Sequence, residues 1–165
     1  MGPAGDVQLR GVRHEDLPTF FEQQCDPDAN KMAAVLPRDR EALMAHWEKI
    51  LADPTTVIRT ITYDGAVAGN VLTFERSGHR EVGYWLGRAF NGKGIATRAL
   101  AAFLLEFRVR PLYAHVAKHN PASVRVLEKC RFRLVGDDKE FATYEGQAIE
   151  GYILMLEAAD EAAPS

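Results

Sequence analysis

Apolar residues occur along the chain in short runs and in longer amphipathic stretches. Short apolar runs bounded by Gly, Pro, Asn or Asp are typical of strands, and apolar positions that recur every three or four residues are typical of helices. The runs predict strands at residues 7–12, 57–63, 67–74, 81–86, 112–116, 132–135 and 149–157. The amphipathic stretches predict helices after Gly94 and after Asp16, Asp39 and Asn120, each of which is a candidate N-cap. This order predicts an α+β fold whose mixed sheet is mostly antiparallel.

The segments between these elements have the composition of turns and loops. Asp64-Gly65 predicts a two-residue hairpin turn between two strands. Residues 25–37 predict a loop, and residues 137–146 predict a polar connection. At 165 residues the chain has the length of one domain, 1–165, in which the small and acidic residues 158–165 are expected to be a frayed tail.

A glycine-rich loop at residues 87–96 lies between the strand at 81–86 and the next helix. In that helix Ile95, Ala99 and Phe103 fall on one apolar face. When a glycine-rich turn opens a helix, the unpaired N–H groups of the first turn and the positive end of the helix dipole point toward the turn. An anion is the natural occupant, so the loop predicts a phosphate-binding site.

The loop differs from the two common nucleotide motifs. Residues 87–93 fit the first part of a P-loop, but Gly94 stands where a P-loop needs Ser or Thr to hold magnesium. Thr97 comes too late in the helix to replace that hydroxyl. The third small residue of a dinucleotide fingerprint is also missing from its required place. A P-loop nucleoside triphosphatase, which would bind magnesium-ATP, is therefore disfavoured.

Two motifs resemble the GNAT superfamily of N-acetyltransferases. Asn91-x-x-Gly94-x-Ala96 matches the last two anchors of that family's acyl-CoA pyrophosphate loop and departs at the first, which is usually Gln or Arg. Asn120-x-x-Ser123 is similar to the helix start of a second motif, which ends in Lys-x-Gly-Phe. The two motifs in this order resemble the RimJ/RimL-type branch, which acetylates the N-termini of ribosomal proteins.

The resemblance implies a GNAT fold with a sheet of six to seven strands and about four helices. It implies acetyl-CoA as the cofactor, and it implies that the strands at 81–86 and 112–116 part to admit the pantetheine arm. Backbone groups left unpaired at the parting would bond to the cofactor, because buried backbone polar groups need partners. The cofactor-binding residues expected on this basis are Tyr84, Trp85, Leu86, Asn91, Gly92, Lys93, Gly94, Ile95, Ala96, Asn120 and Ser123.

For catalysis, the resemblance points to Ser123 as the group that faces the leaving thiolate. Other branches place a Tyr one turn later, where this chain has Leu127. Because serine is a weak acid, we expect a hydrogen bond to the sulfur or a water relay. The expected general base is Glu81, which lies at the start of the strand that leads to the cofactor. The alternative bases, which titrate near neutrality, are His79, His115 and His119.

Two residues depart from the family pattern. Asn91 replaces the long Gln or Arg at the first anchor, which removes one side-chain contact near the phosphates. Arg131 stands where the second motif has a glycine that ends the helix in the left-handed conformation. A non-glycine residue there costs on the order of 1 kcal/mol. Neither change touches the amides that would bind phosphate.

Composition narrows the class of protein further. A net charge of −3 gives no electrostatic reason to expect nucleic acid as a partner. Cys25 and Cys130 have no spacing typical of a metal site or a disulfide framework, so no metal is expected and both are predicted to be reduced thiols. The sequence has no signal-peptide pattern and no run long enough to span a bilayer, which predicts a cytoplasmic protein with no membrane partner.

No motif specifies the acceptor. Acidic residues favour a cationic amine or a peptide N-terminus, although the same residue types also serve in solvated turns: Asp26, Asp28, Asp137, Asp138, Glu140 and Glu145. The expected activity is transfer of acetyl from acetyl-CoA to a primary amine, on a peptide N-terminus or a small molecule. The alternative is a non-catalytic acyl-CoA-binding regulatory module. A homodimer paired through the last strands is compatible with the resemblance.

Overall fold

A single seven-stranded sheet organises the computed structural model, which describes residues 5–36 and 39–158. The strand order is β1-β2-β3-β4-β5-β7-β6. The strands are β1 (Val7–Arg10), β2 (Val57–Tyr63), β3 (Ala66–Arg76), β4 (His79–Leu86), β5 (Leu112–Ala117), β6 (Arg133–Tyr144) and β7 (Gln147–Leu156). Only β4 and β5 run parallel, so the predicted mixed and mostly antiparallel sheet is confirmed. The expected tail lies outside the described residues from position 159 onward.

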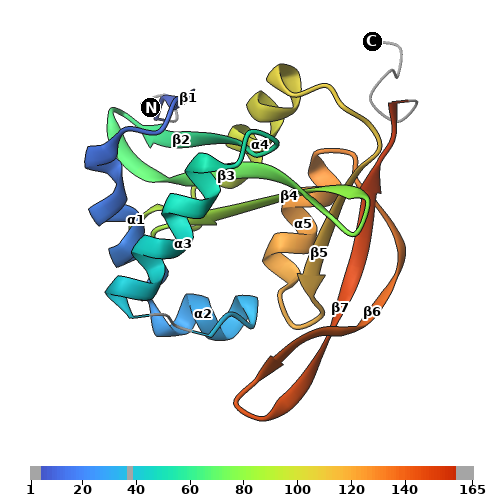
Figure 1. The fold of residues 1–165 in the computed structure, drawn as a ribbon. Helices are drawn as coiled ribbons and strands as arrows, with labels where there is room; N and C mark the ends of the chain where they lie inside the picture. The colour runs from blue at the N-terminus through green and yellow to red at the C-terminus, as the bar shows by residue number, and fades with distance from the viewer. Residues whose placement is uncertain (1–4, 37–38, 159–165) are drawn as a thin grey trace.

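Helices cover both faces of this sheet (Figure 1). The described α-helices are α1 (Leu17–Gln24), α2 (Pro27–Ala33), α3 (Arg40–Ala52), α4 (Ile95–Glu106) and α5 (Pro121–Lys129). One face carries α1, α2 and α3, and the other carries α4 and α5. The expected apolar stripes are buried, since Phe20 stacks on Trp47 beneath α1 and α3, and Phe103 of α4 is fully buried. No helix among the described residues is long and apolar enough to span a bilayer.

Two predicted loops are regular structure instead. Within residues 25–37, α2 forms because Asp26 caps it by accepting a hydrogen bond from the N–H of Asp28, with Pro27 at the first helical position. The predicted connection at 137–146 belongs mostly to β6, which pairs with β7 up to Tyr144. Polar residues misled the prediction there because β6 is the edge of the sheet and faces solvent.

Asp16 has a structural role that differs from the predicted helix cap. Its side chain makes no cap hydrogen bond to α1 and is buried. The Arg10 guanidinium donates to both carboxylate oxygens at 2.8 and 2.9 Å, and the hydroxyl of Thr60 donates at 2.8 Å. Burial alone would raise the pKa of Asp16, but hydrogen bonds from Arg10, from the Arg13 N–H and from Thr60 outweigh it and lower the pKa from 3.8 to about 2. This ion pair joins β1 and β2 to the start of α1.

Asp16→Asn should lower the free energy of unfolding by about 3 kcal/mol near neutral pH, because it leaves the Arg10 guanidinium without its buried carboxylate. The folded-state pKa is below the unfolded one, so the charge contributes above about pH 4 and its contribution fades toward about pH 2. Denaturant unfolding at about pH 7 and about pH 2.5 should therefore show the gap between wild type and variant shrinking by about 2 kcal/mol. The exposed Glu15→Gln is the matched control, and an equal gap at both pH values would contradict the assignment.

Candidate functional site

The parallel strands β4 and β5 part from each other along most of their length. Their only register pair is Glu81 with Tyr113, whereas β4 pairs with β3 from His79 to Leu86. Beyond Glu81, the side of β4 that faces β5 therefore has no strand partner for its backbone N–H and C=O groups. The parting implied by the family resemblance is present, and it leaves polar backbone groups to be satisfied by something else.

A glycine on β3 lets β4 approach it closely at this point. A Cβ atom at Gly69 would lie 1.9 Å from the carbonyl oxygen of Trp85, so no other residue fits there without moving β4. In the register, Gly69 pairs with Leu86 at the end of β4. The end of β4 is therefore close to β3 at the same place where it has separated from β5.

The glycine-rich loop has the backbone conformation of an anion site. Gly92 and Gly94 have φ values of +77° and +73°, in the left-handed region that favours glycine. Apart from the chain neighbours, no described residue has an atom within 4 Å of a Cβ built on either glycine. Gly94 is the N-cap of α4, and no side chain caps the helix there. The first-turn N–H groups of α4 are therefore available to a phosphate. This observation supports the fit of CoA to the loop.

A cavity of about 760 Å³ extends from this loop through the parted strands. Ten of the eleven expected cofactor-binding residues line it: Tyr84, Trp85, Leu86, Asn91, Gly92, Gly94, Ile95, Ala96, Asn120 and Ser123. Lys93 and the expected base Glu81 do not line it. The structure thus brings together two motifs that lie far apart in the sequence, and their individual roles stay predictions.

The side of the cavity toward α5 carries a pair of hydroxyl groups. Tyr84 Oη and Ser123 Oγ lie 2.6 Å apart, and Asn120 caps α5 by accepting from the N–H of Ser123 at 3.4 Å. Burial raises the pKa of Tyr84 to about 12, although the hydrogen bond with Ser123 opposes that rise. The phenol therefore stays protonated near neutral pH and is able to donate a hydrogen bond. The structure shows that Tyr84 has this side-chain contact in addition to its expected backbone role.

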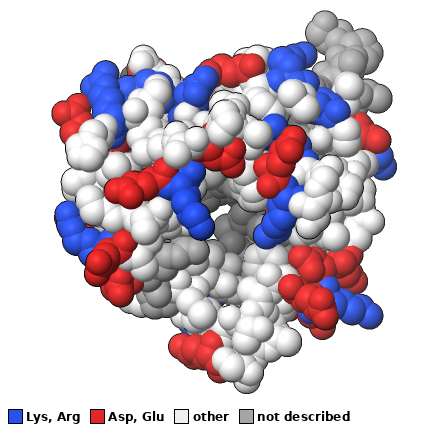
Figure 2. Space-filling model, viewed as in Figure 1, with Lys and Arg blue, Asp and Glu red and all other residues white. Residues whose placement is uncertain are grey.

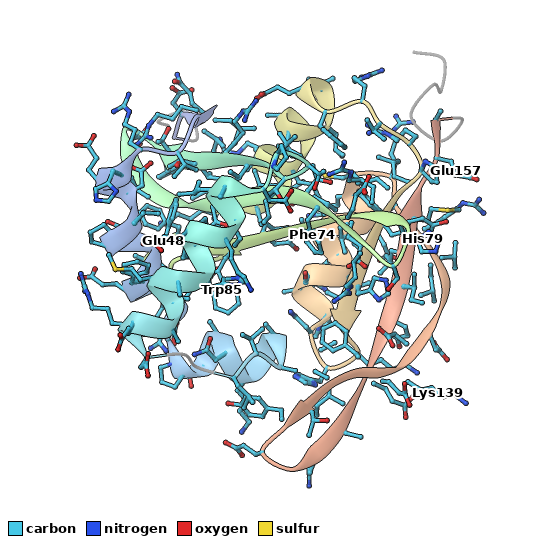
Figure 3. The ribbon with its side chains drawn as sticks, in the orientation of Figure 1. Glu48, Phe74, His79, Trp85, Lys139 and Glu157 are labelled. Atoms are coloured by element: carbon cyan, nitrogen blue, oxygen red, sulfur yellow. The ribbon has the colours of Figure 1, made fainter. Side chains whose placement is uncertain are left out.

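The opposite side of the cavity, toward α1, α2 and α3, has different chemistry. Successive residues of a strand point to opposite faces, so Trp85 points away from Tyr84 and donates its indole N–H to the carbonyl of Gln23 on α1 at 2.9 Å. Figure 3 shows Trp85 between α3 and α2. Figure 2 shows that this face is hollowed near its centre, with charges of both signs on the rim.

Ionisable residues from four strands, β3 to β6, meet at this second side. Glu81 on β4 is 5% exposed, and its two oxygens accept hydrogen bonds from Arg76 at 2.8 and 2.9 Å. His115 on β5 lines the cavity, and its Nδ1 lies 2.9 Å from Oδ2 of Asp138 on β6. His115 Nε2 lies 3.7 Å from Oε2 of Glu81. The sequence alone missed Asp138 as a partner because its segment was predicted to be a loop.

Other charged residues of the site also became apparent only in the structure. Arg88, within the glycine-rich loop, pairs with Asp28 at 2.7 Å and with Asp26, and so ties the start of α2 to that loop. Arg125 and Lys129 of α5 line the cavity. The positive charges of Arg125 and Lys129 are complementary to the negative charge of a phosphate group.

Arg131 follows α5 at the position where the second motif usually has glycine. Its φ is +73°, so a non-glycine residue occupies the left-handed position after α5. The helix nevertheless ends as it would with glycine at that position, because the N–H of Phe132 donates to the carbonyl of Leu127 at 3.0 Å. The second motif thus keeps its backbone geometry without its glycine.

Comparisons with known proteins agree with this geometry. Residues 6–133 match the Acetyltransferase (GNAT) domain, so the chain belongs to the GNAT family of acetyltransferases. The predicted GNAT fold is thereby confirmed.

Individual relatives are distant from this chain. YdaF of Bacillus subtilis, provisionally named a ribosomal N-acetyltransferase, is 32% identical over 63 residues, which span 36% of this chain and only 34% of YdaF. Spermidine N-acetyltransferase from Vibrio cholerae, solved with CoA and spermine, has a TM-score of 0.82 at 19% identity, with 93% of this chain and 96% of that chain covered. RimL, a ribosomal L7/L12 alpha-N-protein acetyltransferase, has a TM-score of 0.80 at 18% identity, with 94% and 92% covered. The two structural likenesses establish the fold.

Gly94→Leu should raise the Kd for acetyl-CoA at least about tenfold, because a side chain would enter the space in front of the α4 N–H groups. Calorimetric titration measures this directly, with magnesium-ATP as a ligand that should not bind. Gly65→Leu is the matched control, since Gly65 also has a positive φ and open space around it but lies in the β2–β3 turn. Equal losses of affinity in both variants would point to backbone strain instead of a phosphate site.

Proposed function

We propose that this protein transfers the acetyl group of acetyl-CoA to a primary amine, and that it is of the RimJ/RimL type. The observation that most supports this proposal is the cavity, which joins the glycine-rich loop to the opposite face of the sheet through the parted strands. Such a passage lets a thioester held on one face meet an amine that enters from the other. The ribosomal N-acetyltransferase names among the relatives support the branch.

Acetyl-CoA would supply the activated acetyl group, and this chain's residues would hold it at three places. The amides from Gly92 to Ala96 would bind the pyrophosphate, because they open α4 without a side-chain cap. Backbone groups of Tyr84, Trp85 and Leu86 would bond to the pantetheine arm at the parting. Asn120 would contribute from the start of α5, where it both caps the helix and lines the cavity.

The acceptor side favours a single amine on a peptide or a small molecule over a polycation. Three of the six acidic residues that suggested a cationic acceptor form ion pairs with Arg or Lys within the chain. These are Asp26 and Asp28 with Arg88, and Asp137 with Lys118. Apolar side chains also line the cavity from α2, among them Met32, which is 46% exposed. A partly neutralised and partly apolar approach suits a peptide α-amine.

Ser123 would donate a hydrogen bond to the departing thiolate. With the Tyr84 hydroxyl as the donor in their 2.6 Å contact, the hydrogen of Ser123 would be free to point into the cavity. The phenol donates without losing its proton, because the pKa of Tyr84 is about 12. The two hydroxyls would then stabilise negative charge on sulfur as a pair, whereas a lone serine would be a weak donor.

The activity is tested with acetyl-CoA and paired probes. One pair is a tetrapeptide with a free α-amine and the same peptide with a blocked N-terminus, and the other pair is spermidine and phenethylamine. We expect CoA release with the free peptide and none with the blocked one, and mass spectrometry should locate one acetyl group on the amine. Tight binding of acetyl-CoA with no turnover on any probe would favour the non-catalytic acyl-CoA-binding module instead.

Tyr84→Phe and Ser123→Ala should each lower kcat about tenfold or more, because each removes a hydrogen bond that stabilises charge. The double variant should lose less than the product of the two single losses, since both act through one chain of hydrogen bonds. Steady-state kinetics with the acetylated probe measures kcat, and the Kd for acetyl-CoA should change little. Tyr63→Phe, outside the cavity, serves as the control. Independent, multiplicative losses would contradict the paired action.

A further inference from the structure

In the cluster of Glu81, His115 and Asp138, His115 is the residue that lines the cavity and can meet the acceptor. Glu81 does not line the cavity, and both of its oxygens are occupied by the Arg76 guanidinium. His115 does line it, at the point where β5 has parted from β4. A proton leaving an amine in the cavity therefore reaches His115 before it reaches Glu81.

The contact with Asp138 sets the protonation pattern of the imidazole. A carboxylate accepts hydrogen bonds, so the 2.9 Å contact requires that Nδ1 of His115 carries a hydrogen and donates it to Oδ2 of Asp138. In the neutral ring, Nε2 then has a free lone pair. Asp138 is itself held in place, because its other oxygen accepts from the N–H of Glu140 at 3.3 Å. The ring is thus fixed in the tautomer that a base needs.

The charges around the ring favour the product of proton transfer. The groups that face it are Glu81 from β4 and Asp138 from β6, with Arg76 of β3 behind Glu81. The 3.7 Å separation of Nε2 and Glu81 Oε2 exceeds a direct hydrogen bond and suits a shared water. An imidazolium would lie between two carboxylates, one of which is partly neutralised by its arginine.

We propose that His115 is the general base of the acetyl transfer, oriented by Asp138 and stabilised in its charged form by Glu81. This inference rests on the proposed transfer to a primary amine. One N–H bond of the acceptor's ammonium group breaks, and the proton joins Nε2 directly or through one water. The freed lone pair forms the C–N bond to the acetyl carbon, and the C–S bond of the thioester breaks. The extra proton on the attacking nitrogen passes to the departing thiolate, which leaves as the CoA thiol, and the imidazolium returns its proton to solvent. Glu81, the base expected from sequence, acts behind His115.

The test compares His115→Gln with wild type on amines that do and do not need a base. At about pH 7 the α-amine of a peptide, with a pKa of about 8, is about nine-tenths protonated, whereas an arylamine is already neutral. We therefore expect His115→Gln to lower kcat/KM about tenfold on the free-amine tetrapeptide at about pH 7, and far less on p-anisidine. The loss on the peptide should shrink as the pH rises to about 9.5, where the amine deprotonates in solution.

Two matched variants control the comparison. His79→Gln removes an exposed histidine that contacts Tyr113 edge-on and does not line the cavity, so it should leave kcat/KM within about threefold. Asp138→Asn should lower kcat/KM because it removes the carboxylate that fixes the tautomer of His115. Asp137→Asn, at the neighbouring position, should have little effect. An equal loss in His115→Gln at every pH and on both amines would overturn the proposal, because it would show a structural role. Wild-type activity that His115→Gln retains would overturn it as well.

Nitrogen NMR of the imidazole ring tests the same inference without an acceptor. The resonances lost in His115→Gln should show a protonated Nδ1 and an unprotonated Nε2 in the neutral ring, and Asp138→Asn should change that pattern. A neutral ring protonated on Nε2 would overturn the proposal. Failure of wild type to acetylate any probe is a separate result, since it contradicts the proposed function and removes the reaction in which His115 would act.

Discussion

The site depends on a backbone constraint: two parallel strands at the centre of the sheet pair at Glu81 and Tyr113 and then part. A central strand without a neighbour leaves polar backbone groups inside the protein, and a fold tolerates this only where another partner can satisfy them. β4 keeps its full ladder with β3, helped by the missing side chain at Gly69, so the opening is confined to the side of β5. The cavity exists because of that asymmetry.

The alternation of side chains along β4 gives the two mouths of the cavity different chemistry. Tyr84 reaches the α5 side and joins Ser123, whereas Trp85 reaches the α1 side and joins Gln23. On β5, His115 lies on the side that meets Asp138 of the C-terminal hairpin. The proposed donors to the leaving group and the proposed acceptors of the proton are thus separated by the thickness of one sheet. Because a strand has a period of two residues, a one-residue register shift would exchange these roles.

Ion pairs hold the surrounding elements against this opening. Arg10 and Asp16 fasten the start of α1 to the first strands, and Arg88 fastens α2 to the phosphate loop through Asp26 and Asp28. The second set is exposed at the arginine, so it contributes mainly to the position of α2 and little to overall stability. The pairs with Arg88 also involve Asp26 and Asp28, two of the acidic residues that suggested a cationic acceptor.

Local patterns by themselves determined the order of the strands and of α1, α3, α4 and α5, the glycine-rich loop and the helix caps at Asp39 and Asn120, because these features depend on residues close together in the chain. They also identified Ser123 and the loop glycines as candidate site residues, because each belongs to a short motif of nearby residues. Only the tertiary structure decided that α2 is a helix over the cavity, that 137–144 is a strand and that His115 faces Asp138 while Glu81 is held by Arg76. Contacts between residues of different elements depend on how strands pair and twist, and polar edge strands carry no hydrophobic signal that reveals their pairing.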